Sequence, residues 1–302
     1  MLDLGVVILN WNTRDLLRVC LKGVLASRGD VRYQVCVVDN ASTDGSAEMA
    51  RAEFPQVQVL QSPVNGGFAA GNNFGLRAFG FGDPAADEPP RHALLLNPDT
   101  EVPPDGLAGL VRYLDEHPAV GCVGPRLVLP DGSLDLACRR SFPTPAVSFW
   151  RITGLSKLFP RSRLFGRYNM TYLDERQEAQ VEAVVGACML VRGEAIARAG
   201  LLDEAFWMYG EDLDWALRIR GAGYTTMYYP GVTVLHHKRA ASRQNPRAAL
   251  EFYRAMRIFY DKHYRATTPP PLGWLVLAGI SLGAQRARWQ LSLRGPSAAP
   301  MA

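Results

Sequence analysis

The stretch "ALLLNPDTEVPPDG" (residues 93–106) contains an apolar run that stops at two polar side chains. A short apolar run bounded by turn residues predicts a buried strand. The strand is followed at once by Asn97, Pro98 and Asp99. Because proline fixes its own φ and cannot continue a strand ladder, we expect Asp99 to leave the strand and point into a cleft. The alternative is a simple Asn-Pro-Asp turn without a ligand.

Strand and helix alternate along the first half of the chain. Short apolar runs predict four strands, at residues 4–9, 33–39, 57–61 and 92–96. Between them, apolar spacing and capping residues predict helices at 13–27, 42–54 and 67–80. This alternation predicts an α/β fold of Rossmann-like type, with a mostly parallel central sheet flanked by helices.

The second half is less regular. Residues 139–180 combine Pro, Arg and aromatic residues, which predicts a mobile loop. Residues 224–237 predict two short strands on either side of Pro230. Residues 246–265 predict an amphipathic helix, and no internal repeat is present.

Composition and charge limit the classes of protein that this chain can belong to. The net charge of +4 is small and Lys and Arg are scattered, so we expect no nucleic-acid partner. The five cysteines form no CxxC pair, which favours buried, reduced thiols in a cytoplasmic protein. No GxxxxGK[ST] segment is present, which excludes a P-loop.

Polar residues follow each of the four predicted strands. In a parallel sheet these strand ends meet at one edge, which is where ligands bind. Their candidate binding residues are Asn10, Asp39, Asn40, Asn65, Gly67, Gly71, Asn72 and Asn97. Asp99 at the same edge predicts a hard divalent cation, Mg²⁺ or Mn²⁺, bound together with substrate phosphates.

Two further clusters carry titratable groups. Glu211, Asp212 and Asp214 open a predicted helix, where one carboxylate could serve as a general base. The simpler interpretation is that acids in a first helical turn favour the helix dipole. His236 and His237 end a predicted strand, where they are either structural or metal ligands.

In their order along the chain, these segments resemble the inverting family 2 glycosyltransferases of GT-A fold. The similarity is greatest to the bacterial branch with rhamnosyltransferases of cell-wall and O-antigen assembly. It covers roughly residues 4–243 and rests on seven motifs: "VVILNWN", "VVDNASTDGS", "NGGFAAGNNFG", "LLLNPDTEV", "GACMLVRG", "FWMYGEDLDWALR" and "VLHHKRAAS".

The resemblance implies a role for each candidate residue. Asn10 and Asp39 would hold the base and ribose of the donor, and the Asn- and Gly-rich loop would line the nucleotide pocket. Asp99 would bind the metal on the diphosphate, with His236, or alternatively His237, as a further ligand. Asp212 would be the catalytic base, and Glu211 would support it or touch the acceptor.

The resemblance also implies a division of the chain and a reaction. Residues 1–265 would form the GT-A domain, with a nucleotide-sugar half of about 1–100 and an acceptor half of about 101–265. The donor would be a dTDP- or UDP-sugar, with rhamnose the leading candidate, and the acceptor a glycan or a polyprenyl-diphosphate-linked glycan. The alternatives are an inactive carbohydrate- or nucleotide-binding relative and a nucleotidyltransferase.

Two departures from the family pattern bear on function. Asn97 stands where the family has the first Asp of its DxD motif, which removes one anionic ligand and weakens the case for metal dependence. The processive QxxRW signature is missing, which argues against a polymerase of the cellulose-synthase type.

The tail, residues 266–302, lies outside the resemblance. Its charge-free core of Leu272 to Ala284 is too short to span a bilayer, which needs about 20 residues. One interpretation is a buried C-terminal helix. The other is an interfacial amphipathic helix, with peripheral contact through 269–294 at the inner face of the plasma membrane and its Trp residues at headgroup depth.

Overall fold

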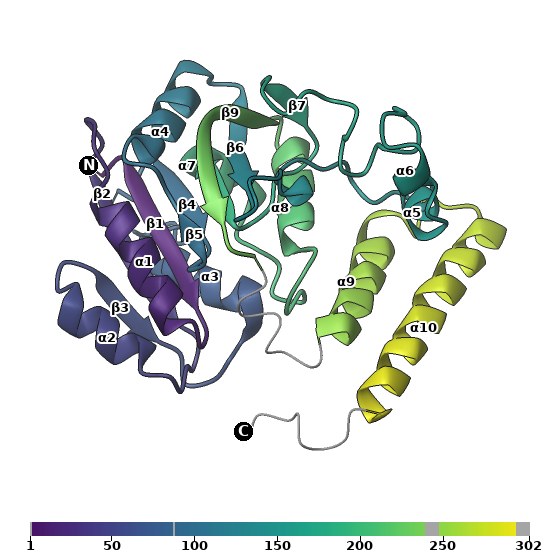
Figure 1. The fold of residues 1–302 in the computed structure, drawn as a ribbon, viewed down its shortest axis with the longest axis horizontal. Coiled ribbons are helices and arrows are strands. Elements are labelled where there is room, and N and C mark those ends of the chain that lie inside the picture. The colour runs from purple at the N-terminus through teal and green to yellow at the C-terminus, as the bar shows by residue number, and fades with distance from the viewer. Residues whose placement is uncertain (1, 87, 239–247, 294–302) are drawn as a thin grey trace.

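The structure, a computed structural model, describes residues 2–86, 88–238 and 248–293 as one nine-stranded sheet flanked by helices (Figure 1). The strands are β1 Leu4–Asn10, β2 Tyr33–Asp39, β3 Gln58–Gln61, β4 His92–Leu96, β5 Thr100–Glu101, β6 Val120–Val128, β7 Ala179–Val181, β8 Cys188–Arg192 and β9 Thr225–His236. The helices are α1 Arg14–Leu25, α2 Ser46–Glu53, α3 Gly67–Ala78, α4 Gly106–Glu116, α5 Pro145–Ile152, α6 Leu155–Leu158, α7 Gly193–Ala199, α8 Glu211–Gly221, α9 Ala248–His263 and α10 Pro270–Leu293, with a 3-10 turn at Leu136–Cys138.

The first half of the sheet is parallel, in the order β3-β2-β1-β4. In this register Asn10 lies opposite Asp39 at the carboxyl ends of β1 and β2. Nearly every residue of β1, β2 and β4 is buried, as the short apolar runs require. The predicted Rossmann-like α/β fold and its four N-terminal strands are therefore confirmed.

Antiparallel pairing enters where β8 joins β4 to β6. The prediction of two short strands at 224–237 is wrong, because β9 is one strand of 12 residues that pairs in parallel with β6. A register irregularity absorbs Pro230 and Gly231: Pro125 pairs with Tyr229, and Arg126 next pairs with Thr233. The end of β9 also pairs with the two-residue β5 that follows Asp99.

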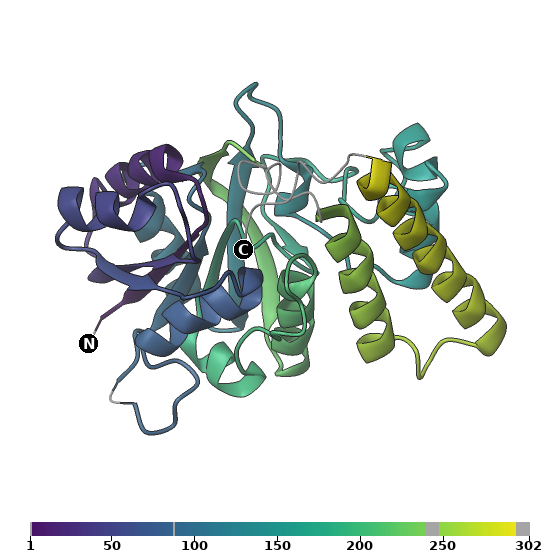
Figure 2. The same cartoon turned by 90° about the horizontal axis from the view of Figure 1, so that it is seen from below.

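Helices cover both faces of the sheet, α1 and α2 on one side and α3 and α8 on the other (Figure 2). Glycines let α3 approach the parallel strands closely. A Cβ on Gly71 would lie 2.3 Å from Leu9 Cδ1, and one on Gly75 would lie 2.5 Å from Val7 Cγ1. The main core lies between these layers, and the five cysteines are buried and free, as predicted.

The segment 139–180 is more ordered than the predicted loop. It contains the short helices α5 and α6 and the beginning of β7, so that prediction is wrong in part. Thr144 caps α5, since its side chain accepts a hydrogen bond from the N–H of Val147. The helices are further held by edge-to-face contact between Trp150 and Phe165, whose ring centroids are 5.1 Å apart.

The C-terminal helix α10 packs on α9 through one narrow seam. Its buried residues Gly273, Ile280 and Ala287 recur every seven positions, and a Cβ on Gly283 would lie 2.2 Å from Tyr253 Cε1. The rest of the described helix is largely exposed, so the interpretation as a buried helix is wrong. None of the described helices is both long and apolar enough to span a bilayer. Residues 294–302 of the tail lie outside the described residues.

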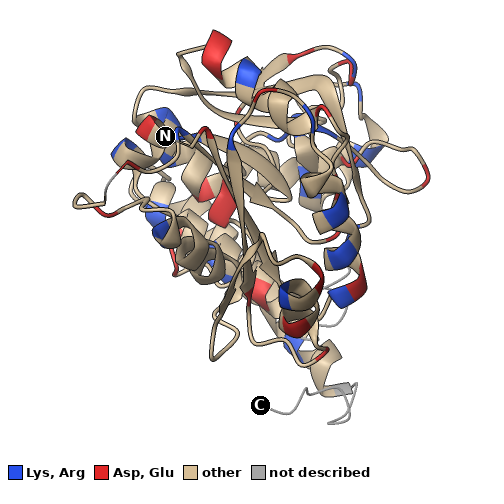
Figure 3. Cartoon of the chain, turned by 90° about the vertical axis from the view of Figure 1, so that its left-hand side faces the viewer, with Lys and Arg blue, Asp and Glu red and all other residues tan. Residues whose placement is uncertain are grey.

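Charge is mixed over the part of the molecule formed by β1–β4 and α1–α4, called the nucleotide half below because the resemblance implies a nucleotide-sugar there. Figure 3 views this half and shows Lys and Arg interspersed with Asp and Glu on its ribbon. Oppositely charged side chains form ion pairs there, such as Arg18 with Glu53 at 2.8 Å and Arg91 with Asp115 at 2.7 Å.

Candidate active site

The carboxyl ends of β1 and β2 form a hydrogen-bonded pair. Asn10 Nδ2 donates to Asp39 Oδ1 at 3.2 Å and to Ser42 Oγ at 3.1 Å, and Thr13 Oγ1 donates to Asn10 Oδ1 at 2.7 Å. The N–H of Ser42 donates to Asp39 Oδ2. Both predicted residues are fully buried beneath this turn. Asn10 therefore fixes the orientation of Asp39, and Asp39 orders the loop over the strand ends.

A second network joins β2 to the start of α3. Asn40 Nδ2 donates to Asn65 Oδ1 at 2.9 Å and to the carbonyl of Gly67 at 3.2 Å. Gly67 has a φ of +85°, and a Cβ there would lie 2.2 Å from the carbonyl oxygen of Trp207, so only glycine fits. The N–H of Phe68 donates to that same carbonyl at 2.6 Å. The glycine loop is thus fastened to the segment that precedes α8.

Gly71 and Asn72 lie on the buried side of α3. Gly71 faces Leu9 of β1, as its close approach shows, and Asn72 Nδ2 donates to the carbonyl of Phe68 at 2.9 Å. Both residues therefore support the packing of α3. Asn65 and Asn97, by contrast, are only half-buried and face the strand edge from two different loops.

Asp99 and His236 come together through the pairing of β5 with β9. His236 Nε2 lies 3.5 Å from Asp99 Oδ1, and both side chains are buried. On its other side His236 Nδ1 lies 2.9 Å from Asp135 Oδ2, and Lys238 Nζ bonds the remaining oxygen of Asp135. His237 instead turns to Glu101, with Nε2 2.7 Å from Oε1. The geometry thus favours His236 over His237 as the partner of Asp99.

This arrangement fits a divalent cation that is completed by a substrate. A carboxylate on the second ring nitrogen is the usual support of a metal-ligating histidine, and Asp135 supplies it. Within the described residues, no group of three or more His, Cys, Asp or Glu side chains could hold a metal by itself. Asp99 and His236 would thus provide two ligands, and a diphosphate and water would provide the others.

Protonation of His236 opposes metal binding. Burial by itself lowers the pKa of His236, but the carboxylates of Asp135 and Asp99 outweigh burial and raise it to about 9. His236 is therefore charged at neutral pH when it faces only these two carboxylates. A cation bound at Nε2 would have to displace that proton.

The carboxylate of Asp212 is held from three sides at the start of α8. Its Oδ2 accepts from Arg140 Nη2 at 2.6 Å and from the N–H of Gly186 at 3.1 Å, and its Oδ1 accepts from the N–H of Leu213. The residue next to Gly186, Ala187, accepts a hydrogen bond from the N–H of Asn97 at 2.9 Å. Two consecutive residues therefore connect the Asp212 carboxylate to the Asn97-Pro98-Asp99 turn.

Glu211 has a different environment from its neighbour. Its Oε2 is buried and has no hydrogen-bond partner among the described residues. Burial, together with the negative charge of Asp212, raises the pKa of Glu211 to about 8. At neutral pH Glu211 is therefore protonated, and it can donate a hydrogen bond where Asp212 accepts.

Sequence reasoning missed two residues that order this site. Arg140 lies 72 positions before Asp212, and Asp135 lies 101 positions before His236. Asp135 follows the common turn pattern "LPDGS" (129–133) and Arg140 lies in "RR" (139–140), a common surface pattern, so neither residue gave a signal. A hint was available in the contrast between Asp135 and Asp131, since only Asp135 lies just before the apolar run Leu136–Cys138.

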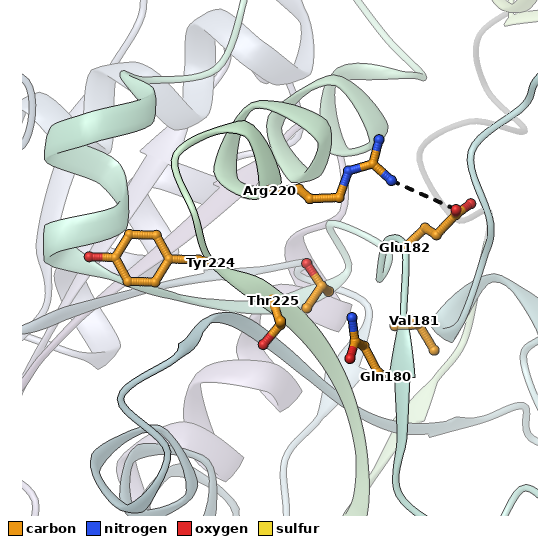
Figure 4. A pocket seen from close by; sticks show the side chains of 7 residues that line it. Gln180, Val181, Glu182, Arg220, Tyr224 and Thr225 are labelled. Atoms are coloured by element: carbon orange, nitrogen blue, oxygen red, sulfur yellow. Dashed lines mark ion pairs between the residues drawn. The ribbon is translucent and has the colours of Figure 1, made fainter.

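A separate pocket of about 150 Å³ lies at the other end of α8 (Figure 4). Its lining includes Glu182 and Arg220, which form an ion pair at 3.8 Å, and Tyr224. Arg220 is nine residues beyond Glu211, or about 13 Å along the helix. This pocket is therefore distinct from the strand edge that carries Asp99 and Asp212.

The fold and the site together define a glycosyltransferase of the GT-A class. A parallel sheet ends in Asn and Asp residues, followed by an acidic turn and a helix that opens on two carboxylates. The profile of glycosyl transferase family 2 matches residues 5–196, well over half of the chain, and the chain belongs to that family.

One of the relatives found by comparison with known sequences matches this chain over most of its length. It is the N-acetylglucosaminyl-diphospho-decaprenol L-rhamnosyltransferase of Mycobacterium tuberculosis, which is 29% identical over 254 residues. The alignment covers 82% of this chain and 81% of that protein. The match therefore extends beyond the family domain into the second half of the molecule.

Solved structures of known glycosyltransferases share the fold at low sequence identity. The mannosyltransferase PcManGT from Pyrobaculum calidifontis, solved with GDP-Man and Mn²⁺, gives a TM-score of 0.57 at 19% identity over 97% of this chain and 76% of that one. GalNAc-T7, solved with UDP, GalNAc and Mn²⁺, gives 0.60 at 15% identity over 87% of this chain and only 49% of that one. Both support the GT-A fold.

Removal of the Arg140 guanidinium should destabilise the protein strongly. Arg140→Met leaves the Asp212 carboxylate buried without its cation, which should cost about 3–5 kcal/mol in the free energy of unfolding. Arg140→Met combined with Asp212→Asn should recover much of this loss, because no buried charge is left unpaired. Urea unfolding of the single and double variants measures the coupling, with the exposed Arg220→Met as control. If the single and the double variant lost the same free energy of unfolding, the result would contradict a charge-based role for Arg140.

Glu211 should make stability depend on pH in a predictable direction. Since its folded-state pKa lies above the unfolded value, the folded protein binds its proton more tightly. The resulting stabilisation is complete below about pH 4.5 and is lost as the pH rises through about 8. The free energy of unfolding of Glu211→Gln, measured with urea, should therefore rise relative to that of the wild type by about 1.4 kcal/mol for each pH unit between pH 5 and 8. A difference that does not change with pH would contradict this, and Glu116→Gln on the exposed surface provides the matched substitution for comparison.

Proposed function

We propose that this chain is an inverting glycosyltransferase that transfers a sugar to a hydroxyl of a polyprenyl-diphosphate-linked glycan in cell-envelope polysaccharide synthesis. Rhamnose from dTDP-rhamnose is the leading candidate for the donor, with UDP-hexoses behind it. The mycobacterial rhamnosyltransferase supports this choice, because the alignment spans most of both chains. Its printed name gives a lipid-linked acceptor, and we extend that acceptor class to this chain.

The donor would bind across the ends of β1, β2 and β4. Asp39, fixed by Asn10, would meet the base or ribose, and Asn65 and Asn97 would line the pocket from the two loops. Asn40, Gly67, Gly71 and Asn72 would shape this pocket by holding the loop and α3 in place.

The observation that carries the proposal is the close approach of Asp99 to His236, supported by Asp135. A divalent cation, Mg²⁺ or Mn²⁺, would neutralise the charge that develops on the leaving diphosphate. Asp99 and His236 would hold it from β5 and β9, and Lys238 would keep Asp135 ionised. In this arrangement His236 would take the place of the second carboxylate ligand that Asn97 cannot supply.

Asp212 would accept the proton of the acceptor hydroxyl as that oxygen attacks the anomeric carbon from the face opposite the leaving group. Arg140 and the N–H of Gly186 orient its carboxylate, and protonated Glu211 would hold the acceptor by donating a hydrogen bond. Both carboxyl groups are present and positioned, which an inactive relative would not require. The segment after β1 offers no cationic triphosphate loop, so a nucleotidyltransferase is disfavoured.

The proposal keeps the division into a domain of residues 1–265 and a tail of 266–302, because α10 contacts the remainder mainly through α9. It places the enzyme in the cytoplasm, with peripheral contact at the inner face of the plasma membrane through 269–294. A lipid-linked acceptor would require such contact.

Thermal-shift titration with dTDP and UDP, with and without Mn²⁺, tests the donor site. One nucleotide should raise the melting temperature only with metal, equivalent to about 2.7 kcal/mol at a hundredfold excess over its Kd. Asp99→Ala should abolish the metal-dependent part, whereas His237→Ala should retain it. Absence of any shift under all metal conditions would remove the support for a donor site at this strand edge.

Transfer to a short polyprenyl-diphosphate-linked acceptor tests the role of Asp212. Asp212→Asn removes the base but keeps the side-chain shape, so kcat should fall by roughly 10²–10⁴-fold. Nucleotide binding by thermal shift should persist, because the donor residues are untouched. Near-normal turnover by Asp212→Asn would assign the base to another group.

A further inference from the structure

Residues 145–167 form an insert that leaves the fold directly beside the carboxylates of α8. The two ends of the insert meet where the N–H of Ser141 donates to the carbonyl of Tyr168 at 2.8 Å. Arg140, adjacent to this junction, holds Asp212. Any surface on which the insert rests would therefore lie next to the acceptor side of the site.

The insert carries positive charge only. It contains Arg151, Lys157, Arg161, Arg163 and Arg167, and no Asp or Glu occurs between residues 136 and 173. Arg151 stacks on a tyrosine ring and Arg167 lies 3.8 Å from Glu182. The other three cations are exposed and form no ion pair with the described residues. This contrasts with the mixed charge of the nucleotide half.

The same insert exposes large apolar side chains. Five of them are between 48% and 72% exposed: Phe149, Ile152, Leu158, Phe159 and Leu164. Within the insert Trp150 packs on Phe165, and Phe149 and Phe159 contact this pair at its edges, yet both remain about half-exposed. Large apolar groups alternating with unpaired cations are typical of a surface that enters the boundary of a lipid bilayer.

The exposed part of α10 lies at the same end of the molecule. In both Figure 1 and Figure 2, α5, α6 and α10 gather at the end opposite β3 and α2. Trp274 and Leu275 are each 71% exposed and Trp289 is 65% exposed, with Arg286 and Arg288 between them along the chain. Two segments more than 100 residues apart thus present the same chemistry in one region.

We propose that the insert 145–167 is the principal docking surface for an anionic lipid bilayer, with α10 as an auxiliary contact. The unpaired cations select anionic headgroups, and the exposed aromatic and aliphatic side chains enter the interface. The inference deepens the proposed function, on which it rests for the lipid-linked acceptor. Because the insert begins beside Arg140, docking would bring the bilayer-borne acceptor to the Asp212 side of the site.

Co-sedimentation of the full chain with vesicles tests this surface. The wild type should bind vesicles that contain phosphatidylglycerol and not those of phosphatidylcholine alone. Charge reversal at Lys157, Arg161 and Arg163 to Glu should weaken binding by roughly a hundredfold. The matched control reverses Lys22, Arg28 and Arg51, three exposed cations on the nucleotide half. All variants should keep the nucleotide-dependent thermal shift, which separates failure of docking from failure of the donor site.

Four outcomes would overturn the proposal. The first is no binding of the wild type to anionic vesicles. The second is equal loss in the insert and control variants, which would indicate a general charge effect. The third is full binding by the insert variant and loss only in Trp274→Ala/Trp289→Ala, which would assign docking to α10. The fourth is a stable dimer in light scattering that Ile152→Glu dissociates, because a second copy would then cover the apolar surface.

Discussion

The candidate site depends on a two-residue backbone connection between its two acidic centres. Gly186 donates to the Asp212 carboxylate, and Ala187 accepts from the N–H of Asn97. A Cβ on Gly186 would lie 3.0 Å from Phe68 Cζ, so the absence of a side chain leaves room for this ring of α3 beside the backbone that holds Asp212. Because β8 starts at the next residue, the sheet register itself sets the spacing between the Asn97-Pro98-Asp99 turn and the Asp212 carboxylate.

Each buried carboxylate of the site needs cations or N–H groups that stabilise its negative charge. Asp212 has a guanidinium and two N–H groups, and Asp135 has His236, Lys238 and the N–H of Ala137. An isolated buried carboxylate would instead take up a proton, as Glu211 does in the charge field of Asp212. Two neighbouring acids on one helical turn thus acquire opposite hydrogen-bonding roles from their surroundings.

Sequence predicted the strand edge because parallel strands end together, and local signals mark those ends. The closeness of Asn10 to Asp39 follows from this rule alone. The sequence could not predict the hydrogen bond between Arg140 and Asp212, because this contact depends on how a long insert returns to the sheet. Nor could it tell that Gly71 packs on Leu9, because a glycine pattern does not show which face of the helix is buried. The single long β9 was missed because proline usually ends a strand, whereas here a register irregularity accommodates it.

Under the proposed function, the two ends of the molecule would have separate binding tasks. The nucleotide half carries charges of both signs, some of them in ion pairs such as Arg18 with Glu53 and Arg91 with Asp115, and under the proposed function it would bind the small anionic donor. The insert and α10 instead expose large apolar side chains together with cations. Exposed apolar surface of this kind lowers solubility and is uncommon on soluble monomers. The site carboxylates lie between these ends, bonded to the donor half through Ala187 and to the base of the insert through Arg140. An enzyme that joins a water-borne donor to a membrane-borne acceptor needs that asymmetry, because its two substrates arrive from different phases.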